Sequence, residues 1–255
     1  MIARPCRIVL IVVLLLAVPL FAAKFWETKE FTKWTEKECK ELLTKSPWAF
    51  SNGFGERPVI NVNPKAEIPE DRAGAQRAEI QPIFGEGAST LVFEFRILTA
   101  KPVRMALAQL QMLRRPDDAV LRARTQQYIE SDPGKEVVIQ VGYHSEPAGS
   151  QATLDAHSYF LHAGLINFRN NTYLATDRNA NIAIMAYRAP HERQPNAELV
   201  FPRFDDKGAP HFTGEEKFIS LRSEFTPDMR GQKRKYDIFV KMNPKNMVFR
   251  DAFTF

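Results

Sequence analysis

Alternation of apolar and polar residues is clearest between residues 89 and 98. The segment STLVFEFRIL places Leu91, Phe93 and Phe95 on one side and polar or smaller residues on the other, which is the two-residue period of a half-buried strand. A second apolar segment of strand length, EVVIQVGY, covers residues 136–143. We expect both segments to be strands of one sheet.

Two helices are predicted between these strands. Pro102 precedes VRMALAQLQMLRR, in which apolar residues recur with helical spacing, and Pro116 precedes a second helix that ends at the SDPG turn, residues 131–134. The fixed φ of proline suits a first helical position. A strand, a long helical connection and another strand are typical of a parallel or mixed βαβ unit with a right-handed crossover.

The rest of the chain is mostly of strand type. After a predicted helix over residues 151–163, we expect strands over 165–170, 181–188, 197–204, 217–225, 236–242 and 246–255. The last two, joined by Asn243, Pro244 and Lys245, are expected to form a terminal hairpin. These elements predict an α+β fold. Its sheet is mixed, mainly antiparallel and five to seven strands wide, with a βαβ-type helical crossover and an N-terminal helical arm.

The predicted arm, residues 24–50, contains the best-defined local motif. Thr35 followed by Glu38 is a capping box, and the helix that it begins should end near Lys45 because Pro47 disfavours helical geometry in the preceding residue. Three tryptophans surround this short amphipathic helix: Trp26, Trp34 and Trp48. They either dock the arm on its own domain or form an exposed anchor for a partner protein.

Residues 1–23 have the pattern of an export signal. Arg4 and Arg7 precede an uncharged, mostly apolar run over residues 8–23, and Lys24 follows it. The run is shorter than the roughly 20 residues of a membrane-spanning helix, and Pro19 interrupts it. We expect a signal peptide, or an N-terminal anchor where it is not cleaved, and a periplasmic or extracellular protein. The glycine- and proline-rich residues 51–88 are predicted to be an extended connection, and residues 89–255 the α+β domain.

Composition excludes some classes of protein. The chain has 255 residues, of which 44% are hydrophobic and 25% charged, proportions typical of a globular protein. Its net charge of +5 falls to +3 without Arg4 and Arg7. This excess of positive charge is too small to indicate a nucleic-acid-binding protein. Cys39 is the only cysteine after the leader, so no intramolecular disulfide is expected, and its acidic neighbours indicate a buried apolar residue rather than a reactive thiol.

Several segments resemble a family. They are Trp-Thr-x-x-Glu, Leu-Leu and Ser-Pro-Trp-Ala over residues 34–49, followed by PVRMALAQLQML, LVFPRF and KNMVFRDAFTF. Their order is similar to that in an uncharacterised group of exported acidobacterial proteins. The resemblance covers most of the chain after the leader and implies export and a single shared domain. It implies no activity and no catalytic residue.

Candidate chemistry is limited to two regions. His144, His157 and His162, with Asp155, are the grouping that most suggests a metal or a hydrolytic site. Helical spacing separates the last two histidines by about 140° around the axis, so we predict no metal and no cofactor. The strongest charge feature is a basic cluster near the predicted terminal hairpin: Arg230, Lys233, Arg234 and Lys235, with Lys241 and Lys245 across from it. The interpretation without a ligand is a solvated loop whose lysines keep an edge strand from aggregating.

These observations favour a non-enzymatic binding or assembly protein of the cell envelope. Its contact would be the tryptophan-rich arm or the basic cluster, and its partner an envelope protein or an anionic surface, with membrane attachment only if the leader is uncleaved. The alternative is an envelope hydrolase whose site lies near His144 and His162. The first hypothesis predicts exposed tryptophans, and the second predicts histidines that converge with a carboxylate in a cleft.

Overall fold

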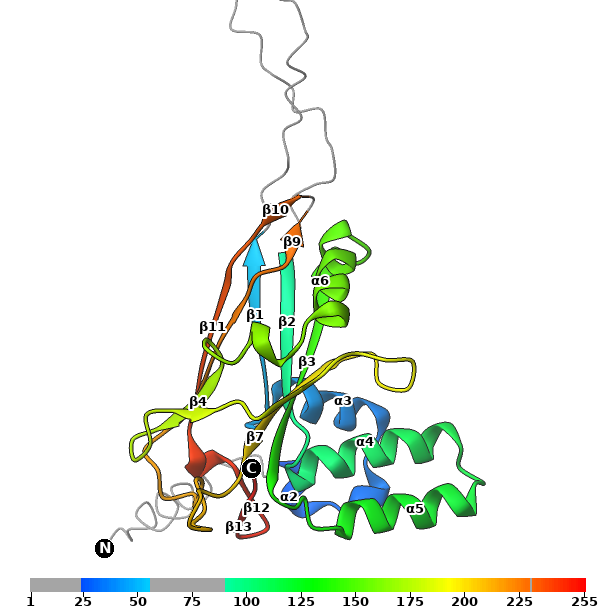
Figure 1. The fold of residues 1–255 in the computed structure, drawn as a ribbon. Coiled ribbons are helices and arrows are strands. Elements are labelled where there is room, and N and C mark those ends of the chain that lie inside the picture. The colour runs from blue at the N-terminus through cyan, green and yellow to red at the C-terminus, as the bar shows by residue number, and fades with distance from the viewer. Residues whose placement is uncertain (1–23, 56–89, 230) are drawn as a thin grey trace, which may run out of the picture.

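The computed structural model describes residues 24–55, 90–229 and 231–255 (Figure 1). The α-helices are α2 (Phe25–Thr28), α3 (Glu36–Lys45), α4 (Lys101–Arg114), α5 (Ala119–Glu130) and α6 (Gln151–His162), and the 3-10 helices are η1 (Phe31–Lys33), η2 (Leu165–Asn167) and η3 (Pro244–Asn246). The strands are β1 (Ala49–Gly55), β2 (Thr90–Ile97), β3 (Glu136–Glu146), β4 (Tyr173–Thr176), β5 (Ile182–Ala183), β6 (Ala186–Arg188), β7 (Ala197–Pro202), β8 (Ile219–Phe225), β9 (Asp228–Met229), β10 (Gln232–Lys233), β11 (Tyr236–Met242), β12 (Val248–Phe249) and β13 (Ala252–Phe253).

Two antiparallel sheets form the centre of the molecule. The larger has the order β1-β2-β3-β7-β6, and the smaller has the order β11-β8-β4-β5. Every strand pairing in them is antiparallel. Helices α3, α4 and α5 lie together at the end of the larger sheet where β2 leaves and β3 enters (Figure 1). The predicted α+β class with a mainly antiparallel sheet is confirmed.

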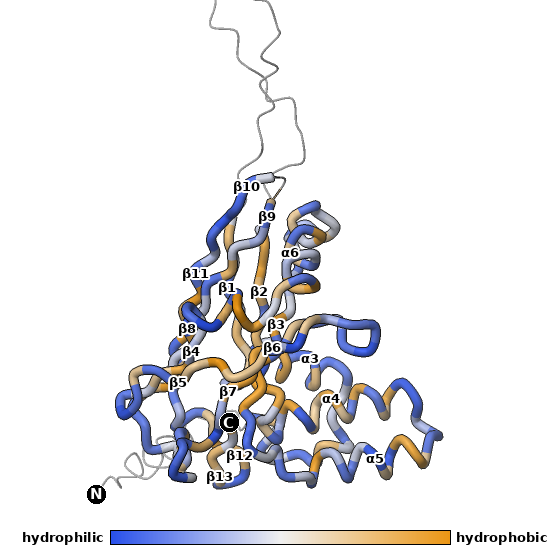
Figure 2. The backbone as a smooth tube through the Cα atoms, in the orientation of Figure 1, coloured by the Kyte–Doolittle hydropathy of each residue, from blue (hydrophilic) through white to orange (hydrophobic). Residues whose placement is uncertain are grey.

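Alternating side chains of β2 build the core between the sheets. Leu91, Phe93, Phe95 and Ile97 are fully buried, as the sequence pattern predicts, and Figure 2 shows apolar residues concentrated in β2 and its neighbours. The ring of Phe93 lies 5.2 Å from that of Phe225 in β8. Phe160 of α6 lies 5.0 Å from the same Phe225 ring. Aromatic packing of this kind holds the two sheets and α6 together.

The predicted helices are confirmed, but the parallel βαβ crossover is wrong. β2 and β3 are direct antiparallel neighbours, with Ile97 opposite Ile139. The reason is that α4 and α5 form a helical hairpin, so the chain returns to the end of the sheet that it left. Asp118 caps α5 by accepting a hydrogen bond from the backbone N–H of Leu121 at 2.8 Å, which begins the returning helix.

Other strand predictions fail where local pattern competes with long-range pairing. Residues 165–170, predicted as a strand, contain η2 instead, and residues 181–188 are divided between β5 and β6. The predicted terminal hairpin is also wrong, because β11 pairs with β8 while β12 and β13 form a small hairpin of their own. In the predicted connection, residues 51–55 belong to β1, which pairs with β2, and residues 56–88 lie outside the described residues.

Candidate functional site

The three tryptophans of the arm are core residues. Trp26 is 6% exposed, Trp34 1% and Trp48 0%, so the prediction that they form an exposed patch is wrong. Two indole N–H groups donate to backbone carbonyls: Trp34 Nε1 to Lys29 at 3.1 Å and Trp48 Nε1 to Thr254 at 2.7 Å. The arm folds back because burying these rings in its own domain removes a large apolar area from water.

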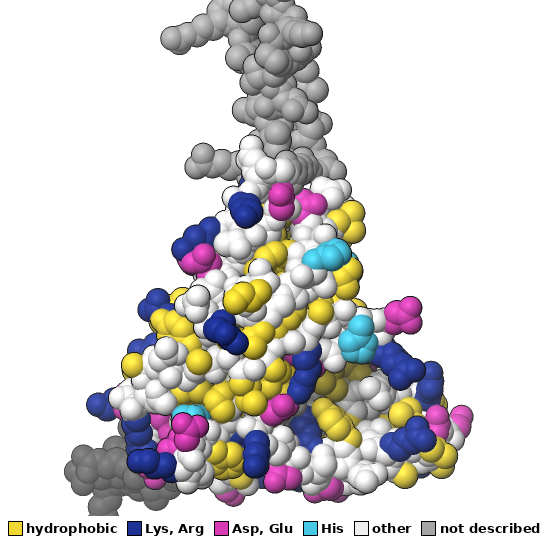
Figure 3. All heavy atoms as spheres, viewed as in Figure 1, with side chains coloured by type: hydrophobic (Ala, Val, Ile, Leu, Met, Phe, Trp, Pro, Cys, Tyr) yellow, Lys and Arg dark blue, Asp and Glu magenta, His cyan; other side chains and the backbone are white. Residues whose placement is uncertain are grey.

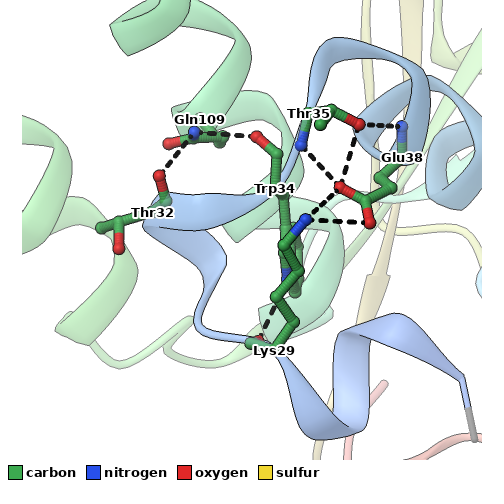
Figure 4. Close-up of polar contacts among 6 residues, drawn as sticks. All are labelled: Lys29, Thr32, Trp34, Thr35, Glu38 and Gln109. Atoms are coloured by element: carbon green, nitrogen blue, oxygen red, sulfur yellow. Dashed lines mark hydrogen bonds and ion pairs between the residues drawn. The ribbon is translucent and has the colours of Figure 1, made fainter.

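Polar contacts fix the position of the arm (Figure 4). The capping box is confirmed: Thr35 Oγ1 accepts from the Glu38 N–H, and the Glu38 carboxylate accepts from the Thr35 N–H. The same carboxylate pairs with the Lys29 ammonium at 2.8 Å. Gln109 of α4 donates its amide to the carbonyls of Thr32 and Trp34 at 3.0 and 2.9 Å. The arm is therefore part of the folded core.

Cys39 is fully buried in the same region. Burial, reinforced by the charge of Glu38, raises the pKa of its thiol to about 12. A thiol in this state carries almost no thiolate at neutral pH and is a poor nucleophile. Its role is packing, as its acidic sequence neighbours indicate.

The histidines of the hydrolase hypothesis do not converge. His144 lies on the solvent side of β3, with Nε2 3.5 Å from Glu146. His157 of α6 bonds through Nδ1 to the hydroxyl of Tyr143, which points to the other side of β3, at 2.7 Å. His162 Nδ1 is 2.8 Å from the Ser158 carbonyl. Adjacent strand residues face opposite sides of a sheet, which separates His144 from the α6 histidines.

Residues 24–55, 90–229 and 231–255 contain no group of three or more His, Cys, Asp or Glu residues arranged to hold a metal ion. In these same ranges, no helix combines the length and apolar character needed to cross a bilayer.

The basic cluster is divided by the fold. Arg230 lies outside the described residues. Lys233 is in β10 and is exposed, and Arg234 follows it with its backbone N–H bonded to Pro227 at 3.0 Å. Lys235 pairs with Glu224 of β8 and, at 3.4 Å, with Asp237. Two carboxylates thus compensate the charge of Lys235, which removes it as a free contact for an anion.

A different set of cations lies beside it on the solvent side of the smaller sheet. Arg222 of β8 is opposite both Phe239 of β11 and Tyr173 of β4, and its guanidinium lies 4.5 Å from the Phe239 ring centre. The ammonium of Lys241 lies 4.8 Å from the ring centre of Phe218. We call these five residues the basic-aromatic face. Figure 3 shows Lys and Arg side chains along the edge formed by β10 and β11.

The geometry of this face suits anion recognition. Phe239 is 50% exposed, although it is a large apolar side chain. Within the described residues, no carboxylate forms an ion pair with Arg222 or Lys241. An aromatic ring orients a cation without neutralising its charge. Arg222 and Lys241 are diagonal neighbours in the β8–β11 pair, and such neighbours lie about 7–8 Å apart, so the two cations can meet successive anionic groups.

Only one residue of the basic-aromatic face was predicted from the sequence. Lys241 was assigned to the basic cluster, but Arg222, Phe218, Phe239 and Tyr173 were not recognised as candidates. Their shared signal is alternation: Arg222 and Phe239 are polar-side positions of two strands that otherwise place apolar residues inward. The register between β8 and β11 places Arg222 opposite Phe239, and the sequence of either strand alone does not specify that register.

Comparison with known proteins gives no family assignment, because no family model, curated protein or solved structure matches this chain.

Proposed function

We propose that this chain is an exported, non-enzymatic binding protein of the cell envelope that holds an acidic polysaccharide on its basic-aromatic face. Export is supported by Arg4 and Arg7 before the apolar run of residues 8–23. The observation that carries the binding proposal is the pair of cations, Arg222 and Lys241, each held over an aromatic ring on one solvent-exposed sheet face.

An acidic polysaccharide fits the chemistry of this face. Its carboxylates can accept hydrogen bonds from the planar guanidinium of Arg222 in a bidentate arrangement. The exposed part of the Phe239 ring and the neighbouring Tyr173 ring offer apolar area to the C–H faces of sugar rings. Ser220 and Ala175, which stand in the same row as Lys241, are small and leave the ammonium accessible.

The test is affinity electrophoresis of the full chain, in mild nonionic detergent, through gels that contain polygalacturonate or neutral dextran. We expect retardation by polygalacturonate only, decreasing with added salt. Arg222→Gln and Lys241→Gln should each weaken retardation severalfold. Phe239→Ala should also weaken it, although it leaves the net charge unchanged, because Arg222 loses the ring that orients it.

The matched control is Lys40→Gln. Lys40 carries the same charge on α3, where it pairs with Glu36 at 2.6 Å. We expect no change in retardation beyond the small change in mobility that the loss of one charge also produces in a dextran gel. Equal weakening by Lys40→Gln and Arg222→Gln, or no effect of Phe239→Ala, would show that net charge alone causes binding and would refute the proposal.

A further inference from the structure

A second cationic site lies at the base of the molecule. Lys24 before α2, Lys245 in η3 and Arg250 in the β12–β13 turn line a pocket of about 360 Å³. Its acidic lining residues are Glu27 and Asp251, so positive charges exceed negative ones. Figure 1 shows that the β12–β13 hairpin and α2 lie together here, although they are far apart in the sequence.

Aromatic rings orient two of the three cations, and none of the three is in an ion pair within the described residues. Lys24 Nζ lies 5.5 Å from the centre of the Trp26 ring, and Arg250 Cζ lies 5.2 Å from that of Phe249. Both rings are buried, which makes them fixed supports. In the described part of the chain, no ion pair joins Lys24, Lys245 or Arg250 to a carboxylate. Their N–H groups therefore remain available to a bound anion.

The backbone at Arg250 also indicates a role for its side chain. Phe249 pairs with Ala252, and the two residues between them have positive φ angles, 49° at Arg250 and 63° at Asp251. Such tight turns favour Asn and Gly, because a side chain is disfavoured at positive φ. Glycine would satisfy this turn better than arginine does. Residues in disfavoured conformations concentrate at functional sites, which is consistent with a ligand that uses the guanidinium.

We propose that this pocket binds a phosphate group, carried by the headgroup of an anionic glycerophospholipid or by a soluble glycerol phosphate. Phosphate oxygens accept the charge-assisted hydrogen bonds that Arg and Lys offer. The volume is at the lower end of small-molecule sites and suits a headgroup rather than an acyl chain. Lys24 directly follows the apolar residues 8–23, so an uncleaved leader would hold the pocket at a membrane surface, and cleavage after Ala23 would add an α-amino group to it.

The test uses two substitutions in the same turn. Arg250→Gly removes a cation and suits the positive φ, so the protein should fold with a thermal midpoint at least equal to that of the parent. Asp251→Gly is the matched control, because it makes the same backbone change but removes an acid. The full chain in maltoside detergent is titrated calorimetrically with short-chain phosphatidylglycerol, short-chain phosphatidylcholine, glycerol 3-phosphate and inorganic phosphate.

We expect the parent protein to bind phosphatidylglycerol and to bind phosphatidylcholine weakly or not at all. Arg250→Gly should lose about tenfold in affinity for phosphatidylglycerol, and Asp251→Gly should bind it as tightly as the parent or more tightly. Glycerol 3-phosphate or inorganic phosphate binding with this variant pattern, without preference for the lipid, supports the phosphate site and assigns it to a soluble ligand. Absence of binding by all phosphate probes, or equal losses in both variants, would overturn the proposal.

Discussion

Gln109 offers a direct measure of what holds the N-terminal arm to the domain. Its side chain is 4% exposed, and its single amide nitrogen donates to two backbone carbonyls, those of Thr32 and Trp34. Gln109→Leu keeps a side chain of similar size but leaves both carbonyls without their donor. A buried acceptor that loses its partner costs about 1–3 kcal/mol. The bond to Trp34 is fully buried and that to Thr32 only partly, so we expect a total loss of about 2–4 kcal/mol.

This loss is a large fraction of the roughly 5–15 kcal/mol that stabilises a typical domain. Urea unfolding of the parent and Gln109→Leu, followed by circular dichroism, measures it as a lower midpoint with an unchanged slope. Gln109→Glu should be worse at pH 7, because an ionised carboxylate would face two carbonyl oxygens, and should recover partly when acid protonates it. Gln126→Leu is the control, because Gln126 is exposed and donates only to Glu130, and should change stability by less than about 0.5 kcal/mol. Identical midpoints for the parent and Gln109→Leu would refute the reasoning.

Three further predictions concern the same region. Lys29 and the Thr35 N–H lower the pKa of Glu38. The stabilisation that the Glu38 carboxylate provides is therefore complete above the ordinary carboxyl pKa and is lost as the pH falls through the lowered value. Glu38→Gln should cost about 1 kcal/mol in urea unfolding at pH 7 and clearly less at pH 3, whereas a constant cost would contradict this assignment. Trp48→Phe should destabilise by about 1–2 kcal/mol through loss of the hydrogen bond to Thr254, and Trp48→Ala by about 3–5 kcal/mol. Unchanged stability of Trp48→Phe would count against a role for the indole N–H. Cys39, whose pKa is raised to about 12, should react with iodoacetamide in urea but not in native buffer at pH 8, and rapid native labelling would show that the arm opens.

Local chemistry explains which parts of the fold were predictable. The hydroxyl of Thr35 and the carboxylate of Glu38 act within one helical turn, and the fixed φ of Pro102 suits the first turn of α4, so sequence alone indicates these elements. Pro116 does not start α5, which begins at Ala119 after the Asp118 cap. Strand partners depend instead on distant segments. Residues 236–242 and 246–255 looked like a hairpin, yet Tyr236 is opposite Phe225. The alternation within each strand is unchanged by the choice of partner, so it carries no information about that choice.

The same limit applies to the candidate sites. The tryptophans could be either anchors or core residues, because composition does not reveal whether an apolar surface is covered by the chain itself. Arg222 and Phe239 form a contact only through the register of β8 and β11. Arg250 and Lys24 come together only because the arm and the β12–β13 hairpin share the base of the fold. Sequence spacing could not indicate either pair.

The hydrogen bond from Trp48 to Thr254 spans 206 positions of the chain. A ribosome makes residue 48 long before residue 254, so the indole has no final partner during most of synthesis. Contacts between such distant segments slow folding, because a long stretch of chain must be ordered before they form. The arm therefore completes its burial only after the β12–β13 segment has emerged. A nascent chain of this kind stays incompletely folded until late, which is the state that the proposed export would require.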